Sequence, residues 1–314
     1  MKSYVGYSTD ANIRYKATSG GIGTALIKYM FEQGVIETSI SFDFDAISLT
    51  YVPKIIHSFN QYTICGSIYQ EIDLVNFIKL HINEIKGTFA CFALPCQTKA
   101  VKSILKRNGH KTIILGLTCS SQQTLEATKY LLKRMNINEK NVSYIRYRGN
   151  GWPSGIHIET YNGENMFIPN NGSIWTKIFH SRIFIRPKCF VCQDTLNQYS
   201  DLTLADPWLK RFSSEKIGKS LVSCNTHEGE LLLNACYKFG YIKLEKIDYE
   251  ETIKSQKKTI LLKNCYRKEI IAKYYKRILL NKYYHKINLI PPFFKIHCKI
   301  KDIVEKYFLN KALH

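Results

Sequence analysis

The sequence predicts an α/β fold with mixed sheets, built from βα units and an antiparallel β region, and a basic helical C-terminal extension. Three observations predict this fold class. Residues 87–107 and 111–135 each run from an apolar strand through a turn into an amphipathic helix, the unit of a parallel sheet. Residues 142–168 alternate apolar and polar side chains between Gly- and Asn-rich turns, which favours antiparallel strands. From residue 251 onward the apolar side chains have helical spacing among many lysines.

The composition is that of a folded globular protein. The chain has 314 residues, of which 45% are hydrophobic and 13% aromatic, so a largely disordered chain is excluded. It has no run of about 18 apolar residues, and residues 1–15 lack the apolar core of an export signal. Ten cysteines without such a signal indicate reduced thiols or metal ligands in a cytoplasmic compartment.

The first strongly patterned element is an amphipathic helix that begins near residue 19. Its apolar stripe consists of Ile22, Ala25, Leu26, Tyr29 and Met30. Thr18 or Ser19 can cap its start, and Gly34 can end it. Gly20 and Gly21 stand at the entrance, where free N–H groups point outward and could hold a phosphate. A plain turn before a helix is the more common reason for such glycines.

The following segments place two cysteines at equivalent turns. Residues 63–73 predict a strand or loop that leads into a helix near residues 74–82. The two βα units come next, and the second opens with a strand at residues 113–117. Cys96 and Cys119 stand just beyond the strand of the first and second unit, respectively. That edge of an open α/β sheet is where ligands bind.

A third turn carries Cys189 and Cys192 as a C-x-x-C motif, which can place two sulfurs on one ion or cluster. A strand at residues 201–206 and a helix from about residue 230 follow. Four thiols from three turns could meet at an iron–sulfur cluster or a zinc ion, or remain plain thiols. The remaining cysteines lie mostly within apolar patterns and are expected to be ordinary thiols: Cys65, Cys91, Cys224, Cys236, Cys265 and Cys298.

Positive charge is concentrated at the C-terminus. The formal net charge is +20, and residues 251–314 contain 16 Lys or Arg against 4 Asp or Glu. These helices are broken at Pro291 and Pro292, and a ragged apolar face around Ile270 and Tyr274 predicts only partial docking onto the rest of the chain. The segment is interpreted as a solvated tail or as a surface for an anionic membrane or acidic partner. No helix-turn-helix, zinc-finger or RRM motif is present, so no specific nucleic acid is expected.

Taken together, the motifs resemble the coenzyme F420 hydrogenase/dehydrogenase beta-subunit family of iron–sulfur flavoproteins. The resemblance runs in family order over about residues 12–240. The segments that carry it are SGGIGTALIKYMFEQGVI from Ser19, CGSIYQ from Cys65, LPCQTKAVKSIL from Leu94, LGLTCSS from Leu115, RPKCFVCQDTLNQYSDLTLADPW from Arg186 and SLVSCNTHEGELLL from Ser220. Each segment alone is a modest match, whereas the ordered set of six is specific.

The resemblance implies a [4Fe–4S] cluster, a bound FAD, and electron transfer to or from a deazaflavin or another redox partner. The cluster ligands that it implies are Cys96, Cys119, Cys189 and Cys192. The resemblance places six residues at the flavin: Ser19, Gly20, Gly21, Gly66, Ser67 and Tyr69. Of these, Ser19, Gly20 and Gly21 would lie against the phosphates of the flavin. No acid–base residue is implied, because the cofactors would carry the chemistry.

The resemblance also divides the chain by role. Residues 1–84 would contact the flavin, residues 85–250 would hold the cluster and the rest of the flavin site in the same catalytic unit, and residues 251–314 would be the basic extension. The implied function is that of an oxidoreductase of undefined substrate, whose partner is a redox protein or a small electron carrier. Bacterial relatives accompany surface-polysaccharide biosynthesis, and the extension suits a cytoplasmic protein peripheral to the inner face of the membrane.

Two departures from the family pattern remove glycines. The chain has Ala-Leu-Pro-Cys at residues 93–96 where the family has Gly-Thr-Pro-Cys, and Ala-Asp-Pro-Trp-Leu at residues 205–209 where the family has Gly-Asp-x-Trp-Gly. Glycines permit close approach to a ligand, so their loss counts against binding of the deazaflavin F420. It also raises an alternative, a scaffold subunit with a cluster or zinc and no flavin chemistry. A ferredoxin-like cysteine run is absent, so one cluster is expected.

Overall fold

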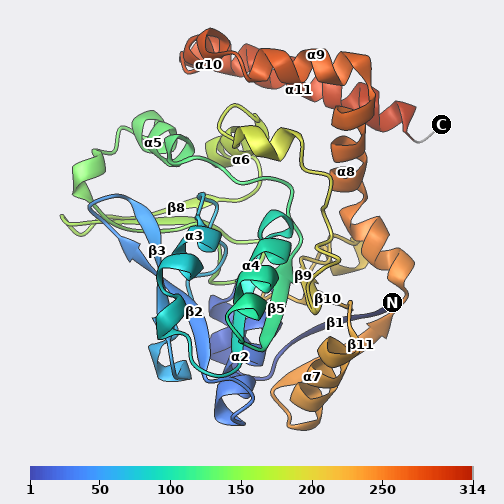
Figure 1. The fold of residues 1–314 in the computed structure, drawn as a ribbon. Helices are drawn as coiled ribbons and strands as arrows, with labels where there is room; N and C mark the ends of the chain where they lie inside the picture. Colours follow the sequence, from blue (N-terminus) through green and yellow to red (C-terminus); the bar gives the residue numbers. More distant parts are fainter. Residues whose placement is uncertain (313–314) are drawn as a thin grey trace.

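The computed structural model describes residues 1–312, and its centre is an eight-stranded mixed sheet (Figure 1). The strand order is β11-β1-β10-β9-β5-β4-β2-β3. The strands are β1 (Lys2–Ser8), β2 (Thr38–Asp45), β3 (Thr50–Ile56), β4 (Phe89–Ala93), β5 (Thr112–Leu117), β9 (Leu202–Ala205), β10 (Ser220–Cys224) and β11 (Ile242–Ile247). The four strands β2, β4, β5 and β9 are parallel, and antiparallel strands flank them on both sides.

A second, three-stranded sheet is antiparallel throughout. It consists of β6 (Val142–Arg146), β7 (Gly155–Thr160) and β8 (Asn165–Pro169) in that order. The predicted fold class is therefore confirmed: the βα units form a mixed sheet, and the antiparallel region forms a sheet of its own.

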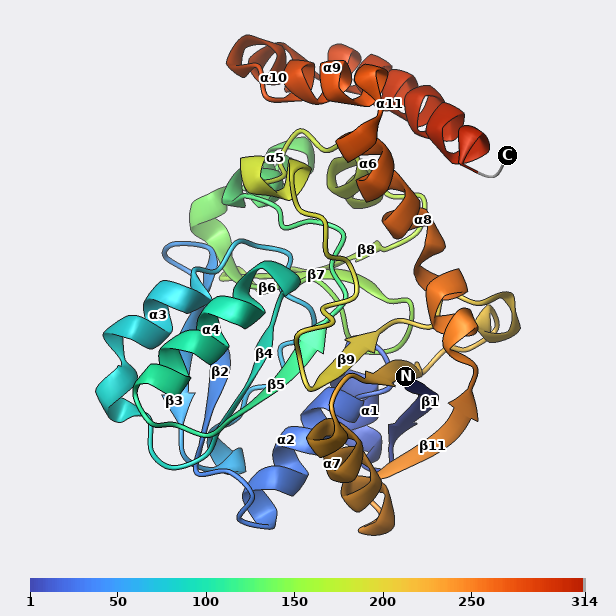
Figure 2. The ribbon, with the colours of Figure 1, turned by 45° about the vertical axis from the view of Figure 1, so that its right-hand side comes forward.

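Helices cover both faces of the large sheet (Figure 2). They are α2 (Ile22–Glu32) and α7 (His227–Lys238) on one face, and α3 (Leu74–Leu80) and α4 (Pro95–Arg107) on the other. Successive strand residues point to opposite faces. Accordingly Ala90 packs in the core under α2, whereas its neighbour Cys91 packs in the core with Val101 of α4.

The other predicted elements are present with small differences. The remaining short elements are α1 (Ala11–Lys16), α5 (Leu125–Arg134), α6 (Ile174–His180), η1 (Phe59–Gln61), η2 (Ile82–Glu84), η3 (Glu139–Asn141), η4 (Pro187–Phe190) and η5 (Lys210–Phe212). Residues 63–69 form a loop and not a strand. Helix α7 begins three residues before the expected position, because the Thr226 side chain caps it by accepting from the N–H of Gly229 at 3.0 Å.

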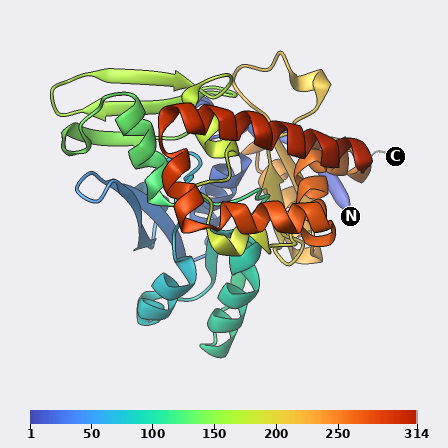
Figure 3. The same cartoon turned by 90° about the horizontal axis from the view of Figure 1, so that it is seen from above.

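The C-terminal extension is docked onto the rest of the chain. It consists of α8 (Tyr249–Lys268), α9 (Ile270–Leu279), α10 (Lys282–Asn288) and α11 (Pro291–Lys311). Helix α8 leads away from the large sheet, and α9, α10 and α11 lie together at one end of the molecule (Figures 1 and 3).

This docking is partial, as the ragged apolar face predicts: Ile270 and Tyr274 of α9 remain exposed, and buried side chains hold the extension to the rest of the chain. Tyr266 and Phe308 of the extension pack in one buried cluster with Phe190, which lies within the C-x-x-C motif. Glu305 of α11 accepts from Arg182 at 2.6 Å in a buried ion pair. Among the described residues, none of the helices is both long and apolar enough to cross a membrane.

Candidate functional site

A cavity of about 300 Å³ lies at the carboxyl ends of the parallel strands. Leu94 follows β4, Cys119 follows β5 and Asp206 follows β9, and all three line the cavity. The first turn of α2 and the loop at residues 64–72 also line the cavity. This edge of an open α/β sheet is where ligands bind, and the volume is at the lower end of the range of small-molecule sites.

Most of the residues that the sequence placed at a flavin line this cavity. They are Ser19, Gly21, Gly66, Ser67 and Tyr69. Gly20 belongs to the same turn but faces the sheet. A Cβ on Gly20 would collide with the carbonyl oxygen of Gly6 in β1 and lie 2.5 Å from the N atom of Ser220 in β10. Gly20 is therefore required by packing within the protein.

The first turn of α2 presents free N–H groups to the cavity. Gly21 is its N-cap, with φ at +78°, and no side chain of the described residues caps the helix through a hydrogen bond. The Ser19 hydroxyl lies 3.1 Å from that of Ser220, and the Ser67 hydroxyl donates to Thr18 at 3.0 Å. Uncapped N–H groups and nearby hydroxyls are the donors that an anionic group such as a phosphate requires.

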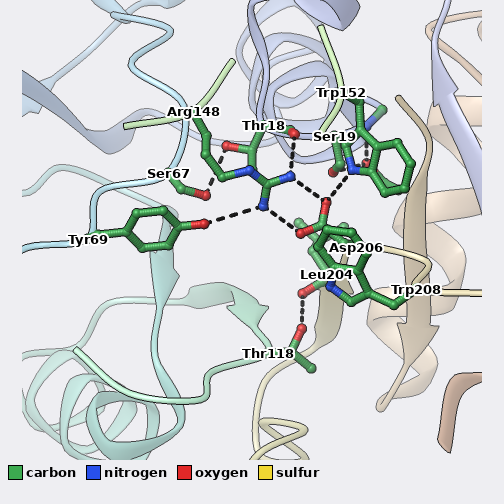
Figure 4. Close-up of polar contacts among 12 residues, drawn as sticks. Thr18, Ser19, Ser67, Tyr69, Thr118, Arg148, Trp152, Leu204, Asp206 and Trp208 are labelled. Carbon is green, nitrogen blue, oxygen red and sulfur yellow. Dashed lines mark hydrogen bonds and ion pairs between the residues drawn. The ribbon is translucent and has the colours of Figure 1, made fainter. Parts of the chain in front are cut away.

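A buried ion pair between Arg148 and Asp206 forms part of the cavity's frame (Figure 4). The guanidinium donates to both carboxylate oxygens of Asp206, at 2.6 and 3.0 Å. It also donates to the carbonyl oxygen of Thr18 at 3.1 Å and to the Tyr69 hydroxyl at 3.4 Å. The indole N–H of Trp152 donates to Asp206 at 2.9 Å. One charged pair thus connects four segments that are distant in the sequence.

The Arg148 side chain is only 3% exposed, and that of Asp206 is 13% exposed. Burial alone would lower the pKa of Arg148, but Asp206 and Tyr69 outweigh it and raise that pKa. The sequence motifs do not single out Arg148 or Trp152, and Asp206 in them is as easily a turn residue as a flavin contact. The one sequence signal for this ion pair is an acidic residue next to an apolar strand, because a carboxylate buried there requires a cation partner.

The four cysteines of the three turns lie around one region next to the cavity. Cys119 lines the cavity, and Cys96 lies on the first turn of α4. Cys189 belongs to η4, and its sulfur accepts from the N–H of Gln122 at 3.5 Å. Cys192 follows two residues after η4.

These thiols are close enough to influence one another's protonation. The pKa of Cys119 is raised to about 12, first by burial and then by the thiols of Cys189, Cys96 and Cys192, while Lys263 opposes the rise. The pKa of Cys96 is also raised by burial and by Cys192 and Cys189, and Lys188 opposes it. An iron cluster would bind the thiolates and release these protons.

The donor set fits an iron–sulfur cluster by its chemistry, because soft thiolates are the ligands of such clusters. Within residues 1–312, no group of three or more His, Cys, Asp or Glu side chains is drawn together tightly enough for one metal ion. A four-iron cluster binds one thiolate on each iron, so its ligands stand farther apart than those of a single ion.

Comparisons with known proteins identify the family and the fold of the chain. Residues 3–79 match the N-terminal model of the coenzyme F420 hydrogenase/dehydrogenase beta subunit, and residues 87–250 match the C-terminal model of the same family. No curated protein matches the chain. A chain of the F420-reducing [NiFe] hydrogenase complex from Methanosarcina barkeri has a similar fold, with a TM-score of 0.62 and 19% identity over 83% of this chain and 88% of that chain. Residues 251–314 lie beyond the matched family segments.

Proposed function

This chain belongs to the coenzyme F420 hydrogenase/dehydrogenase beta-subunit family, and we propose that it is an iron–sulfur flavoprotein oxidoreductase. In this proposal it passes electrons between a [4Fe–4S] cluster, FAD and a redox partner, which is a protein or a small electron carrier. A substrate of surface-polysaccharide biosynthesis is a candidate for the molecule that donates electrons to these cofactors or accepts electrons from them. The family membership supports a redox role, and the site supports the cofactors.

The observation that carries the proposal is the position of Cys119. Cys119 lines the cavity, and its thiol interacts electrostatically with the thiols of Cys96, Cys189 and Cys192. A cluster on these thiols would share a wall with a ligand in the cavity. A shared wall would place the two cofactors close together, which favours direct electron transfer between them.

The residues of the cavity suit the parts of FAD. The first turn of α2, with Ser19 and Ser67 beside it, would hold the diphosphate through N–H and O–H donors. Tyr69 and Phe179 line the cavity with ring centroids 4.8 Å apart, an aromatic wall suited to a flat ring system. When bound, FAD and the cluster supply the exchange between two-electron and one-electron carriers.

The alternative is a subunit that holds a cluster or zinc but has no flavin chemistry. The observation that favours it is that Ala93 and Ala205, which replace glycines of the family motifs, both line the cavity. Their side chains reduce the space for close backbone approach to a ligand. The same substitutions count against the family's deazaflavin F420 as the partner.

An anaerobic purification with cofactor analysis tests the proposal. We expect the absorption bands of a flavin over the broad absorption of an iron–sulfur cluster, with one FAD and four irons per chain. A cluster without flavin, or a colourless zinc-loaded protein, would support the alternative. A protein that binds neither a cluster nor zinc after anaerobic reconstitution would refute both.

We also propose an anionic membrane surface as a partner of α11. One exposed stripe of this helix is apolar and consists of Phe293, Ile296, Ile300, Ile303 and Tyr307. Its lysines alongside the stripe are Lys295, Lys299 and Lys306. An apolar stripe bordered by cations suits the interface of an anionic bilayer, where each basic side chain contributes about 1 kcal/mol.

A further inference from the structure

Helix α8 of the C-terminal extension reaches two loops of the site. At the first loop, Ser255 and Gln256 donate to the carbonyl oxygen of Asp206 at 3.2 and 2.9 Å. The Ser255 hydroxyl also accepts from the N–H of Trp208 at 3.1 Å. The segment that supplies the buried carboxylate of the cavity is thus fixed from the extension.

The second contact is made by Lys263, two turns further along α8. Its ammonium donates to the carbonyl oxygens of Cys119 and Asp194, both at 2.8 Å, and to the sulfur of Cys192 at 3.6 Å. An ammonium has three N–H donors, so each has one acceptor. These acceptors belong to the two loops that carry Cys119 and the C-x-x-C motif, which together hold three of the four thiols.

The positive charge of Lys263 is not neutralised by a carboxylate. Among the ion pairs of residues 1–312, none involves Lys263, and Asp194 contributes its main-chain oxygen. The side chain is half-buried beside the thiols. Its charge therefore acts on the sulfur atoms without a carboxylate paired to it.

Helix α8 is held firmly in this position. Tyr266, one turn after Lys263, is buried together with Phe308 of α11 and with Ile185 and Phe190, which precede and follow the start of η4. The guanidinium of Arg182 lies 4.9 Å from the centroid of the Tyr266 ring. The ammonium is therefore directed at the thiols by packing, and α8 lies almost entirely beyond the matched family segments.

We infer that Lys263 is a positioning residue of the cysteine cluster site, whose charge favours the reduced state of the cluster and whose three N–H groups hold the loops of Cys119 and Cys192. The inference rests on the proposed function. One-electron reduction adds a negative charge to the cluster, and a cation that donates to a ligand sulfur stabilises that charge. Net charge and hydrogen bonds to the sulfurs are among the factors that set the potential of such clusters.

A redox titration of the cluster, followed by its electron paramagnetic resonance signal in the full chain, tests this role. In Lys263→Met the charge is lost, and we expect the equilibrium for reduction to become about tenfold less favourable. For one electron, this is a fall of about 59 mV in the midpoint potential. Lys263→Arg keeps the charge and should restore most of the potential, although a guanidinium cannot repeat the three contacts of the ammonium.

The matched control is Lys257→Met, which removes an exposed lysine from the same helix and should leave the potential unchanged. If Lys263→Met binds less cluster, Lys263→Gln provides a second neutral variant. The role of Lys263 is overturned if both neutral variants have the midpoint potential of the unsubstituted chain. It is also overturned if the midpoint potential of Lys263→Arg falls as far as that of the neutral variants. A failure of the proposed function is distinguishable, because the unsubstituted chain would then lack FAD, or lack the cluster and its signal, whatever the potentials of the variants.

Discussion

Removal of the Asp206 carboxylate should destabilise the protein strongly. In Asp206→Ala the guanidinium of Arg148, which is 3% exposed, loses its two shortest hydrogen bonds, at 2.6 and 3.0 Å. The Trp152 N–H loses its acceptor as well. Breaking a buried ion pair by removing one partner costs about 3–5 kcal/mol, because the other charge stays buried without compensation.

Urea unfolding of the cofactor-free chain measures this cost. With a slope near 3 kcal/mol per molar urea, at the upper end for small proteins, the midpoint should fall by roughly 1–2 M. Glu251→Ala is the matched control, since it breaks the pair with Arg211 at 3.1 Å, whose side chains are 32% and 42% exposed. An exposed pair of this kind contributes about 1 kcal/mol or less.

The double variant Arg148→Met, Asp206→Ala separates the pair from the loss of each side chain. It removes both charges, so it should be less destabilised than the sum of the two single variants, by about 1–3 kcal/mol of coupling. The reasoning would be refuted if Asp206→Ala cost no more than Glu251→Ala. It would also be refuted if the two single effects simply added.

Two further predictions concern the cysteines and the extension. Cys119→Ala should remove most of the iron after anaerobic reconstitution, whereas Cys91→Ala, a buried thiol in β4, should retain it; full iron content in Cys119→Ala would refute the ligand assignment. The double variant Ile300→Glu, Ile303→Glu should sediment less with anionic vesicles at low salt than the unsubstituted chain. A salt concentration of 1 M should release the unsubstituted chain from the vesicles, because the Debye length falls from about 10 Å at 0.1 M to about 3 Å. Ile47→Glu, at an exposed apolar site far from α11 in the sequence, is the control, and equal sedimentation of all three chains would exclude α11 as the membrane surface.

Elements defined by local patterns could be predicted from the sequence. The stripe of α2 and the strand-turn-helix order of β4 with α4 depend on spacings of two to four residues, which a sequence states directly. The turns of Cys96 and Cys119 follow from that order, since parallel strands end at the same edge of a sheet. These local signals were sufficient to locate the cavity edge and one of its thiols.

Contacts between distant segments could not be predicted in this way. Arg148 pairs with a carboxylate 58 residues away, and the ammonium of Lys263 meets a carbonyl oxygen 144 residues away. The first residues of the chain pair with β10 across more than two hundred positions. Each partner alone has an ordinary sequence environment, and the extension resembles a solvated tail in sequence because exposed lysines stand between the buried residues that dock it.

The Ser-Gly-Gly turn shows that a glycine of a ligand-binding motif can be required by packing within the protein itself. A glycine that approaches a ligand and a glycine that approaches the protein's own backbone both need a missing Cβ, so the sequence cannot distinguish them. Gly20 packs on β1 and β10, and Gly66, with φ at +72°, would bring a Cβ into collision with the carbonyl oxygen of Arg148. A larger residue at either position would disturb the sheet or the Arg148 segment before it reached a ligand. The hydroxyls of Ser19 and Ser67 are therefore the better test of the proposed flavin site, because their loss leaves the backbone of both loops in place.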